Sequence, residues 1–224
     1  MLEKNIKTVQ ERLKKAAAKR GVSADSINLV AVTKTVPDAV IRQAYALGLN
    51  TFGENRLQEA LPKVAALPSA INWHFIGHLQ TNKIKNVLPA FQLIHSLDSM
   101  RLAKRIQKEG EKIDKTVNVL LQVNIGLEES KFGFHPSEVE AALEELAGYS
   151  KLKVMGLMAI APFLDDPEAV RPYFRRLYDL YKKIDIPGIT MKYLSMGMSN
   201  DFEVAVEEGA NMVRLGSVIF GERS

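Results

Sequence analysis

The sequence predicts an α/β protein that folds as a (β/α)8 barrel, a closed ring of eight parallel strands surrounded by helices. Strand-like apolar runs alternate with helical segments eight times along the chain, and strict alternation is typical of a parallel sheet. Eight such units favour a closed barrel over a doubly wound open sheet. No GxGxxG or GxxxxGK[ST] motif follows any predicted strand, which argues against a dinucleotide or nucleotide fold.

Size and composition predict one globular domain over residues 1–224. The 224 residues are 46% hydrophobic and 25% charged, so the chain is long enough to bury a substantial core. It contains no cysteine, which excludes disulfides and thiolate metal ligands. No apolar run approaches the roughly 20 residues that a membrane-spanning helix needs, and no apolar signal region opens the chain. We therefore expect a cytoplasmic protein without a membrane partner.

The first predicted element is an amphipathic helix over residues 2–20, which Gly21 ends. Residues 1–20 hold seven basic and two acidic side chains, while the whole chain has a net charge of +4. A basic face is compatible with binding to a membrane surface or a nucleic acid. No aromatic residue accompanies this charge, so we interpret the helix as a solvated cap packed on the barrel and expect no nucleic-acid partner. Its apolar positions are Leu2, Ile6, Val9, Leu13 and Ala17.

The remaining elements follow in order from apolar runs and helix boundary signals. Pro37 suits the first turn of a helix and Gly48 ends it. Asp98 is placed to cap a helix, and the spacing of Ser137 and Glu140 is that of a capping box. The predicted strands are 28–34, 51–55, 71–76, 91–96, 117–124, 153–158, 190–195 and 211–215; the predicted helices are 37–48, 56–66, 80–88, 98–110, 136–147, 166–186 and 200–208.

The first of these strands ends in a lysine. Residues 29–35 read LVAVTKT, an apolar, β-branched run typical of a strand buried on both faces. Lysine is seldom buried without a reason. Lys34 is either a side chain that extends from the strand end to water or an amine whose burial favours its nucleophilic form toward an aldehyde. The other strand ends decide between these interpretations.

The last two strand ends predict an anion-binding site. Active sites of barrels lie at the C-terminal ends of the strands, and phosphate is often bound after strands seven and eight. Ser199 is placed to cap the helix that follows the seventh strand, and Gly216 and Ser217 follow the eighth. Glycine permits close approach of the backbone to a ligand, and serine adds hydroxyl donors. The alternative is an ordinary cap and an ordinary turn. Arg214 either joins a structural ion pair or points into the site.

Together, an amine, a phosphate cradle and an arginine around one barrel mouth suggest pyridoxal 5′-phosphate as cofactor, with Lys34 forming the Schiff base. A metal site is not expected. His74 and His78 are four residues apart, but Gly77 intervenes and no Asp or Glu is near them in the sequence.

Five motifs in order make the chain similar to the pyridoxal phosphate homeostasis proteins over essentially its whole length. The resemblance implies a barrel like the N-terminal domain of alanine racemase and a covalent aldimine at Lys34. It also implies Ser199, Gly216 and Ser217 at the phosphate, Arg214 at the pyridine nitrogen and Asn55 beside the ring; Ser195 and Met196 of the fourth motif complete the cofactor-binding set. The motifs are AVTK (31–34), FGENR (52–56), HFIGHLQTNK (74–83), LSMGMS (194–199) and VRLGSVIFG (213–221).

Two functions are compatible with these residues. The first is a protein of intracellular cofactor homeostasis, which binds, buffers or delivers pyridoxal phosphate without substantial turnover. The second is a small amino-acid racemase or decarboxylase. Similar racemases bring a tyrosine to the opposite face of the cofactor with a second domain, and we expect none here because the chain ends at Ser224. We therefore favour the first, expect no catalytic residues, and expect a monomer whose partners are pyridoxal phosphate and apo-enzymes that receive it.

Overall fold

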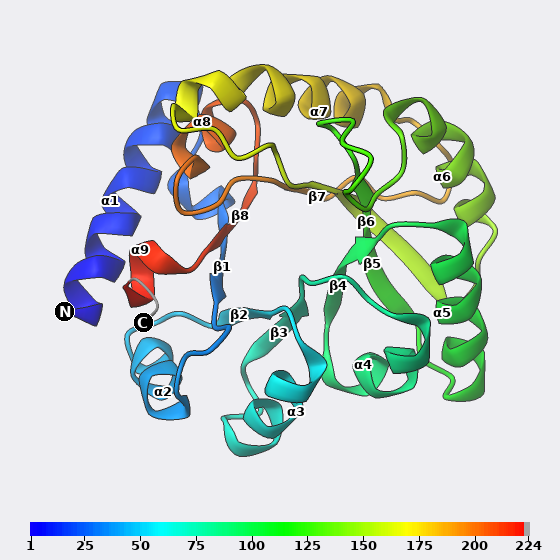
Figure 1. Ribbon diagram of the computed structural model, residues 1–224, viewed down its shortest axis with the longest axis horizontal. Helices are drawn as coiled ribbons and strands as arrows, with labels where there is room; N and C mark the ends of the chain where they lie inside the picture. The colour runs from blue at the N-terminus through cyan, green and yellow to red at the C-terminus, as the bar shows by residue number, and fades with distance from the viewer. Residues whose placement is uncertain (222–224) are drawn as a thin grey trace.

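The structure, a computed structural model, describes residues 1–221 and contains a closed barrel of eight parallel strands (Figure 1). Each strand pairs with the next, and β8 pairs with β1 to close the ring. This confirms the predicted fold class; the last three residues of the predicted domain, 222–224, lie outside the described residues. The strands are β1 Asn28–Val32, β2 Thr51–Glu54, β3 Asn72–Phe75, β4 Leu93–Leu97, β5 Val117–Val123, β6 Leu152–Ala159, β7 Tyr193–Ser195 and β8 Met212–Leu215.

Helices surround the barrel, because each buries one apolar face against the strands and leaves its polar face in water (Figure 1). No described helix has the length and apolar character needed to cross a membrane. The α-helices are α1 Leu2–Arg20, α2 Asp38–Ala46, α3 Leu57–Ala66, α4 Ile84–Ala90, α5 Met100–Lys112, α6 Val139–Ala147, α7 Arg171–Lys183, α8 Phe202–Glu207 and α9 Ser217–Phe220; the 3-10 turns are η1 Ala24–Ser26, η2 Thr81–Lys83, η3 Pro136–Glu138 and η4 Pro167–Val170.

Helix α1 packs along α8 and α9. Its bounds are those predicted from the spacing of its apolar residues. Its basic face is partly neutralised there: Arg12 Nε lies 2.6 Å from a carboxylate oxygen of Glu203, and Lys19 Nζ lies 2.7 Å from Glu207. Gly21 ends the helix with a φ of 79°, a conformation that side chains with a Cβ disfavour. These pairs give the basic helix a structural partner within the chain.

The apolar core has two parts. The larger lies between the barrel and its helices. The smaller cluster is contributed by β1, β4, β5, β6 and β8, so its side chains meet inside the barrel; it comprises Val30, Leu93, Leu120, Met158 and Met212. These residues fill the barrel interior below the ends of the strands, as expected for a ring of eight strands. The barrel interior is therefore packed with side chains below the C-terminal ends of the strands.

Several predicted boundaries and caps were wrong, for local reasons. β1 ends at Val32, so Lys34 lies in the turn that follows the strand rather than at its end. Ser99, not Asp98, caps α5, because its hydroxyl accepts a hydrogen bond from the N–H of Leu102 at 3.3 Å. The capping box at η3 is formed by His135 and Glu138 instead of Ser137 and Glu140. At both caps a neighbouring polar side chain accepts the hydrogen bond that the predicted residue was expected to accept.

Candidate functional site

A cavity of about 590 Å³ opens at the C-terminal ends of the strands. Loops after β1, β2, β6, β7 and β8 contribute to its wall. Six of the eight predicted cofactor-binding residues line it: Lys34, Asn55, Ser199, Arg214, Gly216 and Ser217. The structure therefore brings together an amine, a guanidinium and small polar residues that are up to 183 positions apart in the sequence. Such convergence at the barrel mouth is typical of a binding site.

The turn that carries Lys34 rests on a buried polar cluster. The side chain of Lys63 donates to Thr33 O and to Glu54 Oε1, both at 2.7 Å. The hydroxyl of Thr33 donates to the same carboxylate oxygen at 2.6 Å. Thr35, directly after Lys34, has a φ of 63°, which is costly for a β-branched residue. A buried ion pair thus holds the residue before Lys34, and a strained backbone follows it.

The ends of β7 and β8 meet at Ser199 and Gly216. The N–H of Gly216 donates to Ser199 Oγ at 3.2 Å. The prediction that Ser199 caps the next helix was wrong: the residue before α8 is Asp201, whose Oδ1 accepts the N–H of Met198 at 2.6 Å. Because Asp201 forms that turn, the hydroxyl of Ser199 faces the neighbouring strand end. The two stretches predicted as an anion cradle therefore form one continuous wall.

Gly197 makes this wall possible. Its φ of 94° lies in the left-handed region, and a Cβ at this position would come within 2.6 Å of the Cβ of Ala205. A side chain here would push the loop after β7 away from α8. Glycine therefore permits the tight turn that places Ser199 beside Gly216.

Arg214 lies in the floor of the cavity, where only 5% of its surface is exposed. Its Nη1 donates to Ser195 Oγ at 2.6 Å and its Nη2 donates to Ala159 O at 2.9 Å. Burial lowers the pKa of Arg214 to about 10, against the opposing effect of Asp201. The guanidinium therefore stays charged at neutral pH, and no carboxylate among the described residues forms an ion pair with it.

A chain of buried histidines continues from Arg214 into the barrel. His95 Nδ1 lies 3.1 Å from Ser195 Oγ, and His95 Nε2 lies 3.0 Å from His74 Nδ1. The side-chain nitrogen of Asn72 lies 3.0 Å from His74 Nε2. An amide nitrogen only donates, so His74 accepts there and carries its proton on Nδ1, and His95 does the same. Burial lowers the pKa of His74 to about 4 and that of His95 well below its usual value.

Two predicted residues do not line the cavity. Ser195 is fully buried beneath it and contacts Arg214 and His95 instead. Met196 is fully buried in the core between the barrel and its helices. Ser195, the last residue of β7, therefore points into the barrel, and Met196, which follows the strand, points outward.

Other residues at the site were not predicted from the sequence. Lys63, Glu54 and His95 have no local motif that indicates their contacts, which join different elements. The sequence also placed no acid near His78, but the structure does: His78 Nδ1 lies 2.9 Å from Asp98 Oδ2. No cluster of three or more potential metal ligands occurs within residues 1–221.

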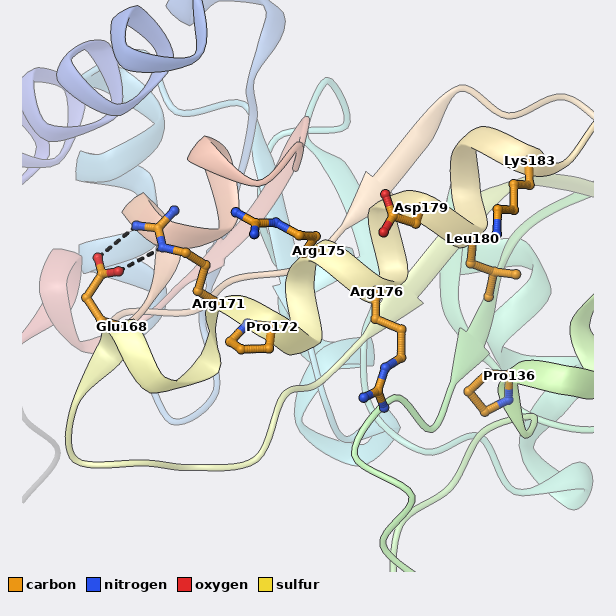
Figure 2. Close-up of a pocket in the computed structure, with 9 residues that line it drawn as sticks. All are labelled: Pro136, Glu168, Arg171, Pro172, Arg175, Arg176, Asp179, Leu180 and Lys183. Atoms are coloured by element: carbon orange, nitrogen blue, oxygen red, sulfur yellow. Dashed lines mark hydrogen bonds and ion pairs between the residues drawn. The ribbon is translucent and has the colours of Figure 1, made fainter.

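A second cavity, of about 620 Å³, lies on the outer side of the molecule along α7 (Figure 2). Two of its three arginines bind acids of the chain: Arg171 binds Glu168, Glu207 and Glu208, and Arg175 binds Glu208. These hydrogen bonds raise the pKa of Arg171. The cavity is away from the strand ends that carry Lys34, so we assign the functional site to the barrel mouth.

Comparison with known proteins agrees with this site. The family described as alanine racemase, N-terminal domain, matches residues 2–224. The pyridoxal phosphate homeostasis protein of Aquifex aeolicus is 46% identical over 220 residues, covering 97% of this chain and 96% of that protein. The human protein of the same name is 40% identical, covering 97% of this chain and 85% of its own. The chain belongs to the pyridoxal phosphate homeostasis protein family.

A solved structure similar to this chain contains bound pyridoxal phosphate. The structure of PipY from Synechococcus elongatus PCC7942 with pyridoxal phosphate bound has a TM-score of 0.79 and 35% sequence identity, and the match covers 95% of this chain and all of that one.

The residues at the barrel mouth fit the same cofactor. Asn55 Oδ1 is buried with no hydrogen-bond partner in the described structure, and Asn55 lines the cavity. A buried acceptor without a partner is costly unless a ligand satisfies it. Val32 and Ile76 add apolar walls for an aromatic ring, and Ser199 with Gly216 offers polar groups for a phosphate.

Proposed function

We propose that this protein binds pyridoxal 5′-phosphate at the barrel mouth and takes part in intracellular homeostasis of the cofactor. The convergence of Lys34, Arg214 and the Ser199–Gly216 wall on one cavity carries the proposal. The family name and the cofactor in a solved relative support it. Lys34 is proposed to hold the cofactor covalently, as a Schiff base between its Nζ and the aldehyde.

The other residues have separate roles in this proposal. Ser199, Gly216 and Ser217 bind the phosphate, whose charge strengthens each hydrogen bond. Arg214 faces the pyridine nitrogen from the floor, positioned by Ser195. Asn55 supplies its unpartnered oxygen to a polar group of the ring.

We further propose that the protein carries the cofactor without substantial turnover. Among the residues that line the cavity, the ionisable side chains are Lys34, Asp201 and Arg214. Asp201 is held by the N–H of Met198, and Arg214 stays protonated. Racemisation needs an acid/base group on each face of the cofactor, and the lining beyond Lys34 on the β6 side is apolar, from Ile160 to Leu164. Binding, buffering and delivery need no second group.

We also propose that the protein is a cytoplasmic monomer that gives its cofactor to apo-enzymes. The cavity lies open at the strand ends, which suits release of the cofactor.

The test is spectroscopic. Wild-type protein titrated with pyridoxal phosphate is expected to develop the absorbance band of a Schiff base and to lose it on borohydride reduction. Lys34→Ala should abolish this band, whereas the matched control Lys153→Ala, at an exposed position on β6, should retain it. A band that persists in Lys34→Ala overturns the assignment.

A second measurement tests the absence of turnover. Holo-protein is incubated with L- and D-amino acids, and chirality and decarboxylation are followed. Turnover near the roughly 10 s⁻¹ typical of enzymes would restore the racemase or decarboxylase alternative.

A further inference from the structure

Exposed apolar side chains gather around the mouth of the cavity. Leu127, Phe132, Ile160 and Phe163 are 50%, 53%, 37% and 80% exposed. All four lie in the loops after β5 and β6, at the end of the barrel where Lys34 lies. Ile160 and Phe163 also line the cavity. Large apolar side chains left in water at one place indicate an interaction site rather than chance exposure.

These four residues belong to one surface, because their loops touch. A Cβ on Gly126 would come within 3.0 Å of Pro162, so the loops after β5 and β6 are packed together. Phe132 stacks on His78 with the ring centres 3.7 Å apart. The apolar rim therefore continues from β6 to the loop after β3.

A basic groove of about 720 Å³ borders the same loop after β3. Thr81 and Asn82 form one side of it, and α5 forms the other with Arg101, Lys104, Arg105 and Lys108. Their spacing of three and four residues puts the four cations on one face of the helix. Lys104 lies 3.5 Å from Glu145; the other three have no ion-pair partner among residues 1–221. The basic residues Arg12 and Lys19 of α1, by contrast, are paired with acids of α8.

We propose that the apolar rim and the basic groove form one docking surface for an acidic protein, the apo-enzyme that takes up the cofactor. The inference rests on the proposed carrier function and names where its partner binds. Unpaired cations attract a surface of opposite charge, and the apolar rim matches the apolar centre of a protein interface. A nucleic acid matches this surface less well than an acidic protein does. Its polyanionic backbone would leave the apolar rim uncovered, and the four cations span only about 10 Å along the helix, which is a short stretch for contacts to phosphates.

The test measures complex formation and cofactor transfer together. Holo-protein is mixed with a purified apo-aminotransferase of net negative charge. Binding is followed by sedimentation velocity, and transfer by the recovery of aminotransferase activity. Arg101→Glu/Arg105→Glu should slow association about tenfold at low salt, with the difference shrinking at high salt. The matched control Lys14→Glu/Lys15→Glu reverses two exposed cations on α1 and should match wild type.

A second variant tests the apolar rim. Leu127 has a φ of 55°, which asparagine tolerates, so Leu127→Asn removes the apolar surface without straining the loop. We expect it to weaken the complex about threefold or more, with pyridoxal phosphate binding unchanged. Unchanged binding and transfer in both variants would overturn the docking surface.

Three further outcomes separate the alternatives. If wild-type protein forms no Schiff-base band, the carrier function itself fails. A normal band without a complex overturns the docking surface alone. If wild-type protein forms concentration-dependent dimers that Arg101→Glu/Arg105→Glu abolishes, the groove binds a second copy of the chain. If it binds a duplex DNA oligonucleotide and the same variant abolishes that binding, the groove binds a nucleic acid. Either result would also overturn the proposal.

Discussion

Arg214 donates a hydrogen bond of 2.6 Å to Ser195 Oγ in the floor of the cavity, joining the ends of β8 and β7. Its second nitrogen reaches Ala159 O of β6 at 2.9 Å. The guanidinium is thus held between neighbouring strands and has little freedom to move. A charged side chain fixed in this way is oriented before any ligand binds, which lowers the entropic cost of binding.

Ser195→Ala should loosen this floor. Removing the hydroxyl leaves one N–H of a buried guanidinium without an acceptor, so we expect the free energy of unfolding to fall by about 1–3 kcal/mol. The absorbance maximum of the bound cofactor should shift as Arg214 moves. The matched control is Ser96→Ala. Ser96 is buried like Ser195, but its hydroxyl has no hydrogen-bond partner in the described structure, so this variant should lower the free energy of unfolding only slightly. Equal losses in the two variants would contradict the role given to Ser195.

Ser199→Ala should weaken binding of the phosphate. A hydrogen bond to a charged group contributes about 1.5–3 kcal/mol, so affinity for pyridoxal phosphate should fall about tenfold or more while the fold is retained. Affinity for pyridoxal, which lacks the phosphate, should not change. Titration of both compounds by absorbance measures this, and the same drop for both would remove Ser199 from the phosphate site.

Lys63→Met should destabilise the turn that carries Lys34. It leaves Glu54 fully buried without its cation, which costs about 3–5 kcal/mol in comparable buried pairs. Glu54→Gln/Lys63→Met removes the uncompensated charge and should recover part of this loss. Urea unfolding gives the stability, and the rate at which the Schiff-base band develops reports on Lys34. A double variant no more stable than Lys63→Met would show that charge is not the cause.

Stability should fall as the solution is acidified below pH 6.5. The pKa of His74 is lowered by burial from 6.5 to about 4, so between these values the unfolded chain binds more protons than the folded one. The stabilisation is complete above pH 6.5 and is lost as the pH falls toward 4, by roughly 3 kcal/mol in total. His95 shifts in the same direction. Chemical denaturation at pH 7.5 and pH 5 measures the effect, and His74→Gln should reduce it.

Much of the site could be predicted because barrel sites follow a simple positional rule. Lys34, Ser199, Arg214 and Gly216 each lie at or just after the end of a strand, and the ends of parallel strands meet at one rim. The periodicity of apolar residues and the residues typical of turns mark the strand ends in the sequence. These four residues could therefore be placed at the rim without knowledge of their contacts. The fold itself followed from the alternation of strands and helices, since a parallel strand requires a crossover before the next.

Tertiary structure alone decided how these residues are held. Ser195 and His95 are 100 positions apart, and only the closure of the ring brings β7 and β4 side chains together inside it. The hydroxyl of Ser199 binds Gly216 because Asp201 satisfies the turn before α8. Such contacts depend on the direction in which each side chain points and on which neighbouring acceptor takes a given N–H. No short sequence pattern indicates either of these. The positions of the strand ends along the sequence indicate which chemical groups reach the barrel mouth, and packing determines what each of them touches there.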